Sequence, residues 1–222
     1  MLWRIYGPLV RCNASSPSFV IGQMGQSLDG RIATQAGQSH YINGPAAILH
    51  LHRLRALVDA VVIGVGTAIA DDPQLTVRHV AGPQPARVVI DPNGRLPGYM
   101  RCLHQDGARR IVVGDGPPLA GIEHVRLKPG PGGLAPSAII GALRDLGLKR
   151  ILIEGGGQTV SRFLEAKALN RLHVMVSSMV IGAGPVGLSF GAIADLKDAL
   201  RPKVTTYPMA GGDTLFDCAF EG

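Results

Sequence analysis

The sequence alternates short apolar segments with glycine-rich turns and helix-forming stretches along most of its length. The apolar segments, rich in Val, Ile and Leu, predict strands at 19–24, 60–63, 87–91, 109–113, 122–127, 150–153 and 173–177. Helical patterns fall between several of these strands, at 43–58, 137–146 and 158–166. Because the strands are apolar throughout rather than alternating, both faces of the sheet must be covered. The pattern therefore predicts an α/β fold with a mostly parallel sheet and helices on both faces.

The C-terminal part of the chain breaks this alternation. Two further strands are expected near Val204 and Leu215, with no helix between them. A parallel pair needs a long crossover connection, so these strands are expected to pair antiparallel at one edge of the sheet. No repeat or linker interrupts the pattern, which predicts a single domain over 19–222 and an N-terminal extension over 1–18.

The first predicted helix, over 43–58, carries both core and functional candidates. Pro45 suits its first turn. Its apolar stripe, at helical spacing, consists of Ile48, Leu51, Leu54 and Val58. Arg53 and Arg55 are expected to lie on other faces of the helix.

The composition limits the classes of function. With 46% hydrophobic and 17% charged residues, the chain has ample apolar material for a buried core. No apolar run approaches the roughly 20 residues that span a bilayer. Arg4 and Arg11 interrupt the apolar N-terminus, which argues against a signal peptide. A cytoplasmic protein without a membrane partner is therefore expected.

The formal net charge of +6 favours anionic partners. The basic residues are scattered and only 5% of residues are aromatic, so a nucleic-acid-binding surface is not expected. A phosphorylated small molecule fits this charge better. Cys12, Cys102 and Cys218 are far apart and the histidines lack ligand spacing, so no metal site is expected either.

Two glycine-rich loops directly follow predicted strands. The loop at 64–67 (GVGT) resembles the start of a dinucleotide-binding fingerprint, but Ile69 stands where the third glycine would be. It is either a phosphate-binding turn or a plain strand-to-helix turn. The loop at 155–157 (GGG) precedes a helix, whose free N–H groups suit a pyrophosphate. Both loops are expected at the carboxyl ends of parallel strands, where open α/β sheets bind ligands.

Several charged residues are further candidates for the ligand site. Glu154 is either a partner for the N–H groups of a bound heterocycle or a solvated carboxylate. Arg55 and Arg78 either clamp a phosphate, which guanidinium groups bind bidentately, or lie on the surface. Asp71 and Asp72 are adjacent in an extended loop and point to opposite sides, so they do not readily share a metal ion.

Several segments together resemble the reductase half of the riboflavin-pathway deaminase/reductase family. They lie at 26–33, 39–42, 54–56, 66–78, 87–91 and 153–156, and the stretch 70–78 (ADDPQLTVR) is highly specific. The resemblance runs from about Phe19 to the C-terminus. The H-x-E and P-C-x-x-C motifs of the family's zinc deaminase domain are absent from the sequence.

This resemblance implies a dihydrofolate-reductase-like fold, a homodimer and the reduction of a ribosylaminopyrimidine 5′-phosphate by NADPH, in which the open-chain ribose becomes ribityl. By position, the substrate would be held by Ser39, Arg55, Leu75, Arg78 and Glu154. NADPH would be held by Gly25, Tyr41, Thr67, Asp71 and the stretch 156–162, which begins with Gly156, Gly157, Gln158 and Thr159. Arg95 is a candidate for the cofactor's 2′-phosphate. Tyr41 stands where the family often has Trp, and no catalytic acid or base is identified.

Two other functions are compatible with the same residues. One is the reduction of another pterin or pyrimidine such as dihydrofolate, which would require a buried carboxylate beside the pterin ring; Glu154 is the candidate. The other is a non-catalytic ligand-binding paralogue. The presence of Arg55, Arg78 and Glu154 argues against the second, since a silent protein could lose them.

Overall fold

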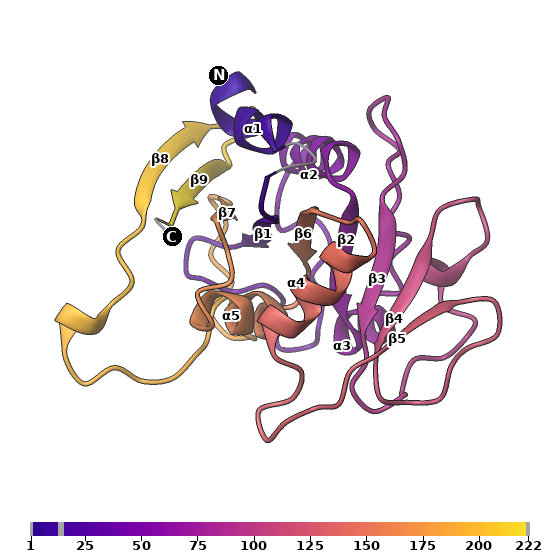
Figure 1. Ribbon diagram of the computed structural model, residues 1–222. Coiled ribbons are helices and arrows are strands. Elements are labelled where there is room, and N and C mark those ends of the chain that lie inside the picture. Colours follow the sequence, from indigo (N-terminus) through magenta and orange to yellow (C-terminus); the bar gives the residue numbers. More distant parts are fainter. Residues whose placement is uncertain (1, 13–15, 221–222) are drawn as a thin grey trace.

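The computed structural model describes residues 2–12 and 16–220, and its strands form a single sheet (Figure 1). The nine strands of these residues follow the order β5-β4-β3-β2-β6-β1-β7-β9-β8. In chain order they are β1 (Phe19–Gln26), β2 (Ala60–Gly64), β3 (Ala86–Ile90), β4 (Arg110–Gly114), β5 (Glu123–Arg126), β6 (Arg150–Glu154), β7 (Arg171–Val176), β8 (Lys203–Pro208) and β9 (Thr214–Ala219).

All pairings from β5 across the sheet to β7 are parallel, whereas β9 pairs antiparallel with both β7 and β8. The parallel strands are separated in the chain by crossovers, but β8 and β9 are joined by a short turn that permits only an antiparallel pair. The predicted fold class, a mostly parallel α/β sheet with an antiparallel C-terminal edge, is confirmed.

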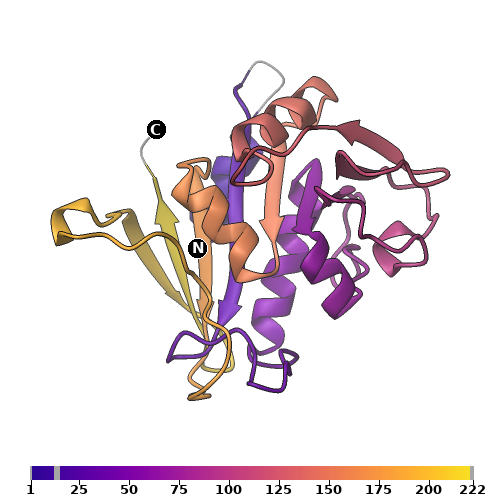
Figure 2. The same ribbon diagram turned by 90° about the horizontal axis from the view of Figure 1, so that it is seen from below.

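Helices cover both faces of the sheet (Figures 1 and 2). They are α1 (Leu2–Arg11), α2 (Pro45–Leu57), α3 (Val65–Asp71), α4 (Pro136–Asp145) and α5 (Gly157–Glu165), with short 3₁₀ turns η1 (Arg101–Leu103) and η2 (Leu196–Asp198). The first three helices share one hydrophobic core cluster with the sheet, and α4 and α5 share the other. The inner strands β1, β2, β3, β4 and β6 are therefore buried on both sides, which explains their apolar character, whereas the edge strands β5 and β8 are largely exposed.

Helix α1 lies in the part of the chain that the sequence analysis left without secondary structure. Ile5, Tyr6 and Leu9 are buried and belong to the same core cluster as α2. Gly7 and Pro8 are poor helix formers, so local sequence favours this helix weakly. Packing against the core provides the missing stabilisation. The division into a 1–18 extension and a 19–222 domain stays a prediction, although α1 contributes to the domain's core.

Helix α2 buries a wider face than the one predicted. Leu54 and Val58 are buried and Leu51 packs against the core, as expected, but Ile48 is 37% exposed. The helix also buries three polar side chains, Arg55, His50 and His52, although Arg55 was expected on another face. Apolar periodicity missed these positions because the polar side chains of α2 find hydrogen-bond partners inside the protein.

The parallel strands place their carboxyl ends at one edge of the sheet. In the register, Gln23 of β1 lies beside Glu154 of β6, and Gly64 of β2 lies beside Ile90 of β3. The loops that leave β1, β2, β3 and β6 therefore start close together. This edge is where ligands bind in open α/β sheets.

Candidate active site

A cavity of about 1000 Å³ opens at the carboxyl ends of these strands. Its walls come from α2, from α3 and the loop after it, and from the loops that follow β1, β3 and β6. All the individually named substrate and cofactor candidates line it: Gly25, Ser39, Tyr41, Arg55, Thr67, Asp71, Leu75, Arg78, Arg95, Glu154, Gly156, Gly157, Gln158 and Thr159. In the rest of the predicted stretch 156–162, Arg162 also lines the cavity, whereas Val160 and Ser161 are buried and do not. Segments far apart in the sequence thus share one cavity large enough for two small ligands.

Arg55 and Glu154 form a bidentate ion pair in the wall of the cavity. The Nε of Arg55 donates to Oε1 of Glu154 at 2.8 Å, and its Nη2 donates to Oε2 at 2.6 Å. Both side chains are buried, where a charge requires a partner. The sequence analysis gave the two residues separate roles and did not predict that they pair.

The pair keeps some capacity to bind a ligand. The Nη1 of Arg55 donates to the backbone oxygen of Thr76 at 3.1 Å, which engages three of the five guanidinium N–H groups. The two carboxylate oxygens of Glu154 each have a further lone pair. The pair therefore presents donors and acceptors with little net charge.

Arg78 carries its charge differently. Its Nη1 donates to two neutral oxygens, Oε1 of Gln74 at 2.8 Å and Oγ1 of Thr76 at 2.6 Å. Partial burial, and then the positive charges of Arg55 and Arg101, lower the pKa of the Arg78 guanidinium. An anion at this point would relieve that repulsion, as a phosphate site requires.

The two glycine loops interlock. The backbone N–H of Gly156 donates to Oγ1 of Thr67 at 3.0 Å, so the loop after β6 is tied to α3. A Cβ at Gly64 would lie 2.6 Å from Oγ1 of Thr159, and a Cβ at Gly156 would lie 2.8 Å from Oγ1 of Thr67. Gly155 adopts a left-handed φ of 87°, which other residues rarely accept. Glycine is therefore favoured here by the close approach of the two threonine side chains and by the φ of Gly155.

Helix α5 begins at this loop without a side-chain cap. Gly156 occupies the N-cap position, and the first turn has no acidic residue. Gly156, Gly157, Gln158 and Thr159 all line the cavity. The end of the helix thus offers N–H groups and a partial positive charge to an anion.

The remaining predicted residues lie around the rim. Tyr41 is 84% exposed and has a φ of 70°. Arg95 is exposed, and Ser39 is partly exposed. Burial raises the pKa of the Asp71 carboxyl, which ends α3.

Three basic cavity residues, His40, His52 and Arg101, had no role predicted from the sequence. His52 is buried beside Arg55 on α2, and its Nδ1 accepts the backbone N–H of Arg78 at 3.0 Å. Arg101 lines the cavity and its backbone N–H donates to Oδ1 of Asp72 at 2.7 Å. His52 could have been predicted from its position about one helical turn before Arg55, which places both on one face of the helix. No sequence pattern pointed to Arg101.

The family model named RibD C-terminal domain matches residues 18–205. The chain belongs to this family. The match covers every predicted site residue, and the family resemblance drawn from the sequence is confirmed.

Curated relatives of this RibD-family chain are named for the riboflavin pathway. A 2,5-diamino-6-ribosylamino-4(3H)-pyrimidinone 5′-phosphate reductase of Methanothermobacter thermautotrophicus is 28% identical over 214 residues, covering 92% of this chain and 99% of that protein. The riboflavin biosynthesis protein RibD of Mycobacterium tuberculosis is 32% identical over 193 residues, covering 85% of this chain. The matched region spans 50% of the length of that RibD protein.

Solved RibD structures share the fold. Form 1 of Acinetobacter baumannii RibD superimposes with a TM-score of 0.81 at 25% identity, over 98% of this chain and 62% of that one. The predicted dihydrofolate-reductase-like architecture is thereby confirmed.

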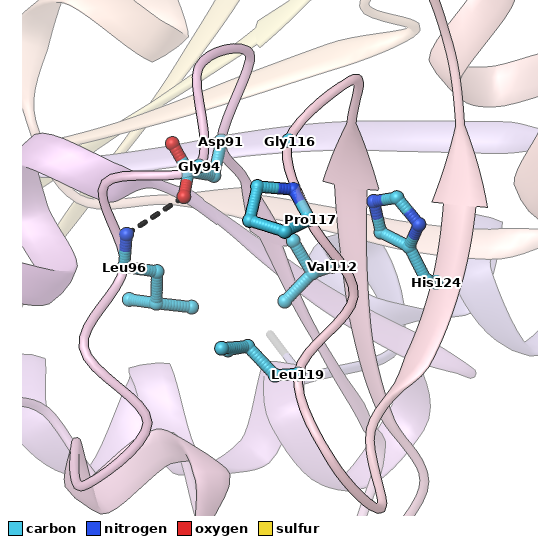
Figure 3. A pocket seen from close by; sticks show the side chains of 8 residues that line it. All are labelled: Asp91, Gly94, Leu96, Val112, Gly116, Pro117, Leu119 and His124. Atoms are coloured by element: carbon cyan, nitrogen blue, oxygen red, sulfur yellow. Dashed lines mark hydrogen bonds between the residues drawn. The ribbon is translucent and has the colours of Figure 1, made fainter.

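A second, much smaller hollow lies outside the RibD-type cavity (Figure 3). It measures about 20 Å³ and shares no lining residue with the large cavity. Asp91 borders it and accepts the backbone N–H of Leu96 through Oδ2 at 2.7 Å. A single water molecule would fill such a volume, so this hollow is no substrate site.

Among residues 2–12 and 16–220, no three His, Cys, Asp or Glu side chains gather in a way that could hold a metal ion. In the same described part of the chain, no helix is long and apolar enough to cross a membrane.

Proposed function

We propose that this chain is an NADPH-dependent reductase that converts a ribosylaminopyrimidine 5′-phosphate to its ribityl form. The observation that carries the proposal is the single cavity lined by all the individually named candidates for substrate and cofactor. The relatives named as reductases of such a phosphate support the same activity.

On the substrate side, Arg78 is the proposed phosphate ligand because its charge lacks a carboxylate partner in the described residues. Arg55 and Glu154 would contact polar groups of the substrate through the donors and acceptors that their ion pair leaves free. Ser39 and Leu75 complete the proposed substrate wall.

On the cofactor side, the residues fit a dinucleotide. The uncapped start of α5, with Gly156 to Thr159 along the cavity, suits a pyrophosphate. Gly25, Tyr41, Thr67 and Asp71 are the further proposed contacts, and Arg95 is the proposed partner of the 2′-phosphate that distinguishes NADPH from NADH. Bound there, the cofactor would supply a hydride.

The protein's own contribution is chiefly positioning. Hydride transfer requires the donor carbon and the sugar carbon in near-attack contact, which a rigid two-ligand cavity provides. The interlocked loops at Thr67 and Gly156 hold the cofactor wall, and the Arg55–Glu154 pair holds the substrate wall.

The charges at the cavity argue against a dihydrofolate reductase. That reaction would need a buried carboxylate beside the pterin ring, and the charge of Glu154 is already balanced by Arg55. The basic side chains at the cavity, Arg78 and Arg101, suit a phosphorylated substrate instead.

The test follows NADPH oxidation by absorbance with three substrates in parallel. These are the diaminopyrimidinone ribosylamino phosphate, its deaminated uracil counterpart and dihydrofolate. Turnover of either ribosyl phosphate, without turnover of dihydrofolate, supports the proposal and identifies the preferred pyrimidine. Turnover of dihydrofolate alone overturns it, and NADPH binding without any turnover favours a non-catalytic paralogue.

We also propose that the protein is a cytoplasmic homodimer. The segment between β7 and β8 exposes several large apolar side chains, and its part around η2 stands away from the main body (Figure 1). These are Met179, Val180, Phe190, Ile193, Leu196 and Leu200. Exposed apolar patches commonly mark protein–protein contacts. Analytical ultracentrifugation of the wild type and of Leu196→Glu tests this; a wild-type monomer would overturn the dimer.

A further inference from the structure

His52 has no assigned role, yet it occupies a central place in the substrate wall. It lies on α2 three residues before Arg55, is only 1% exposed, and lines the cavity. Its Nδ1 accepts the backbone N–H of Arg78 at 3.0 Å. The histidine thus contacts Arg78, the residue proposed to bind the phosphate, at its backbone N–H and not at its guanidinium.

The surroundings keep this ring in the form that can accept. Burial first, and then the positive charges near it from Arg55, His79 and Arg78, lower the pKa of His52 to about 4. The ring is therefore neutral at pH 7. Since Nδ1 accepts a hydrogen bond, the proton of the neutral ring is on Nε2.

The segment around Arg78 is fixed at its backbone on two sides. From α2, Nη1 of Arg55 donates to the backbone oxygen of Thr76, and Nδ1 of His52 accepts the backbone N–H of Arg78. From the other side, the amide of Gln84 accepts from the N–H of Val77 at 2.7 Å and donates to its oxygen at 2.9 Å.

The side chain of Arg78, in contrast, is exposed and bound only by neutral groups of its own loop. The backbone hydrogen bond to His52 therefore connects this loop to the rigid helix at Arg78 itself. A flexible arginine side chain gains affinity for an anion when the backbone that carries it is held in place, because less conformational freedom is lost on binding.

We propose that His52 is a positioning residue, which anchors the backbone of Arg78 to α2 so that the guanidinium is preorganised for the substrate's phosphate. This inference rests on the proposed function. It predicts an effect on binding of the phosphorylated ligand and little effect on NADPH or on the hydride step.

The test compares variants that differ in one property. His52→Phe keeps a ring but lacks the acceptor, and His52→Leu lacks both. His52→Asn replaces Nδ1 with an amide oxygen. His79→Leu is the matched control, because the exposed His79 ring contacts His52 edge-on at 4.5 Å between centroids yet makes no contact with the cavity.

We expect His52→Phe and His52→Leu to raise KM for the ribosylaminopyrimidine phosphate about tenfold, as loss of a buried acceptor implies. Their kcat and NADPH dissociation constant should change less than twofold. His52→Asn should recover most of the loss, and His79→Leu should match the wild type. Two results would overturn the proposal. One is a loss of NADPH affinity as large as the rise in KM, and the other is the same KM in His52→Asn as in His52→Leu.

A double-mutant cycle separates positioning from a general structural role. In an Arg78→Ala background, His52→Phe should produce no further rise in KM; an additional tenfold rise would contradict action through Arg78. If one variant that lacks the acceptor does not fold, the other serves, since Phe and Leu differ in volume.

Failure of the proposed function is recognised separately. If the wild type turns over no ribosylaminopyrimidine phosphate, calorimetric binding of ribose 5-phosphate replaces KM as the measurement. About tenfold weaker binding in His52→Phe than in the wild type then supports the inference by itself. Equal binding in the two proteins, or none in the wild type, overturns it.

Discussion

Arg55 and Glu154 lie 99 positions apart in the chain and meet in the cavity wall as a bidentate, buried ion pair. The pair connects helix α2 to the carboxyl end of β6, and each of these elements contributes one side chain to the proposed substrate wall. Its consequence is that neither residue acts as an isolated charge. Changes at either one should affect both stability and substrate binding.

Removing one partner should strongly destabilise the protein. Glu154→Leu leaves the Arg55 guanidinium buried without its counter-ion, which typically costs roughly 3–5 kcal/mol. The matched control is Glu123→Leu, which breaks the exposed bidentate pair with Arg109 and should cost at most about 1 kcal/mol. Urea denaturation measures both, and similar losses in the two variants would contradict a special role for the buried pair.

Arg78→Ala should weaken the substrate far more than NADPH. The expected rise in KM for the phosphorylated substrate is at least about tenfold, because a charge-assisted contact to phosphate is lost. NADPH affinity, measured by fluorescence titration, should stay within twofold. Arg144→Ala, on the exposed side of α4, serves as control. Equal losses of substrate and cofactor affinity would exclude Arg78 as a phosphate ligand.

Gly156→Val should abolish NADPH binding. The new Cβ would lie 2.8 Å from Oγ1 of Thr67, so the loop before α5 must move away from its present position. Gly141→Val introduces the same side chain on α4, where a Cβ meets nothing within 4 Å. Near-native circular dichroism for both variants, with NADPH affinity lost only at Gly156, is the expected result. A folded Gly156→Val protein with unchanged affinity would place the cofactor elsewhere.

Stability should fall as the pH is lowered below 6.5. Burial is the largest cause that depresses the pKa of His50 to about 3 and that of His52 to about 4, from the ordinary value of 6.5. Between those values the unfolded chain binds protons that the folded chain excludes, so the neutral rings favour folding above pH 6.5 and this contribution is lost toward pH 4.

The expected slope of the unfolding free energy is about 1.4 kcal/mol per pH unit for each histidine. Urea titrations between pH 5 and 6.5 measure this slope, because ordinary carboxylates titrate at lower pH. His50→Gln, which removes one of the two groups, should reduce the slope. A flat profile in the wild type would show that these histidines are not held neutral.

Much of the fold was predictable from local pattern. The strand at 60–63 is uniformly apolar, and the strand at 150–153 is apolar after Arg150, because both faces of the sheet are covered there; the two coincide with β2 and β6 within a residue. The antiparallel edge also followed from a missing crossover. Helix α1 was not predictable in this way, because its stability comes from packing Ile5 and Leu9 on the core and not from its own propensity.

The sequence by itself determined the family, the parallel sheet and the glycine loops, because each depends on residues close together in the chain. Short-range order fixes strand character, turn geometry and specific motifs such as 70–78. The tertiary structure alone decided that Arg55 pairs with Glu154 and that His52 holds the backbone of Arg78. Hydrogen bonds between side chains on separate elements depend on how α2 is rotated against the sheet, and no local pattern encodes that rotation.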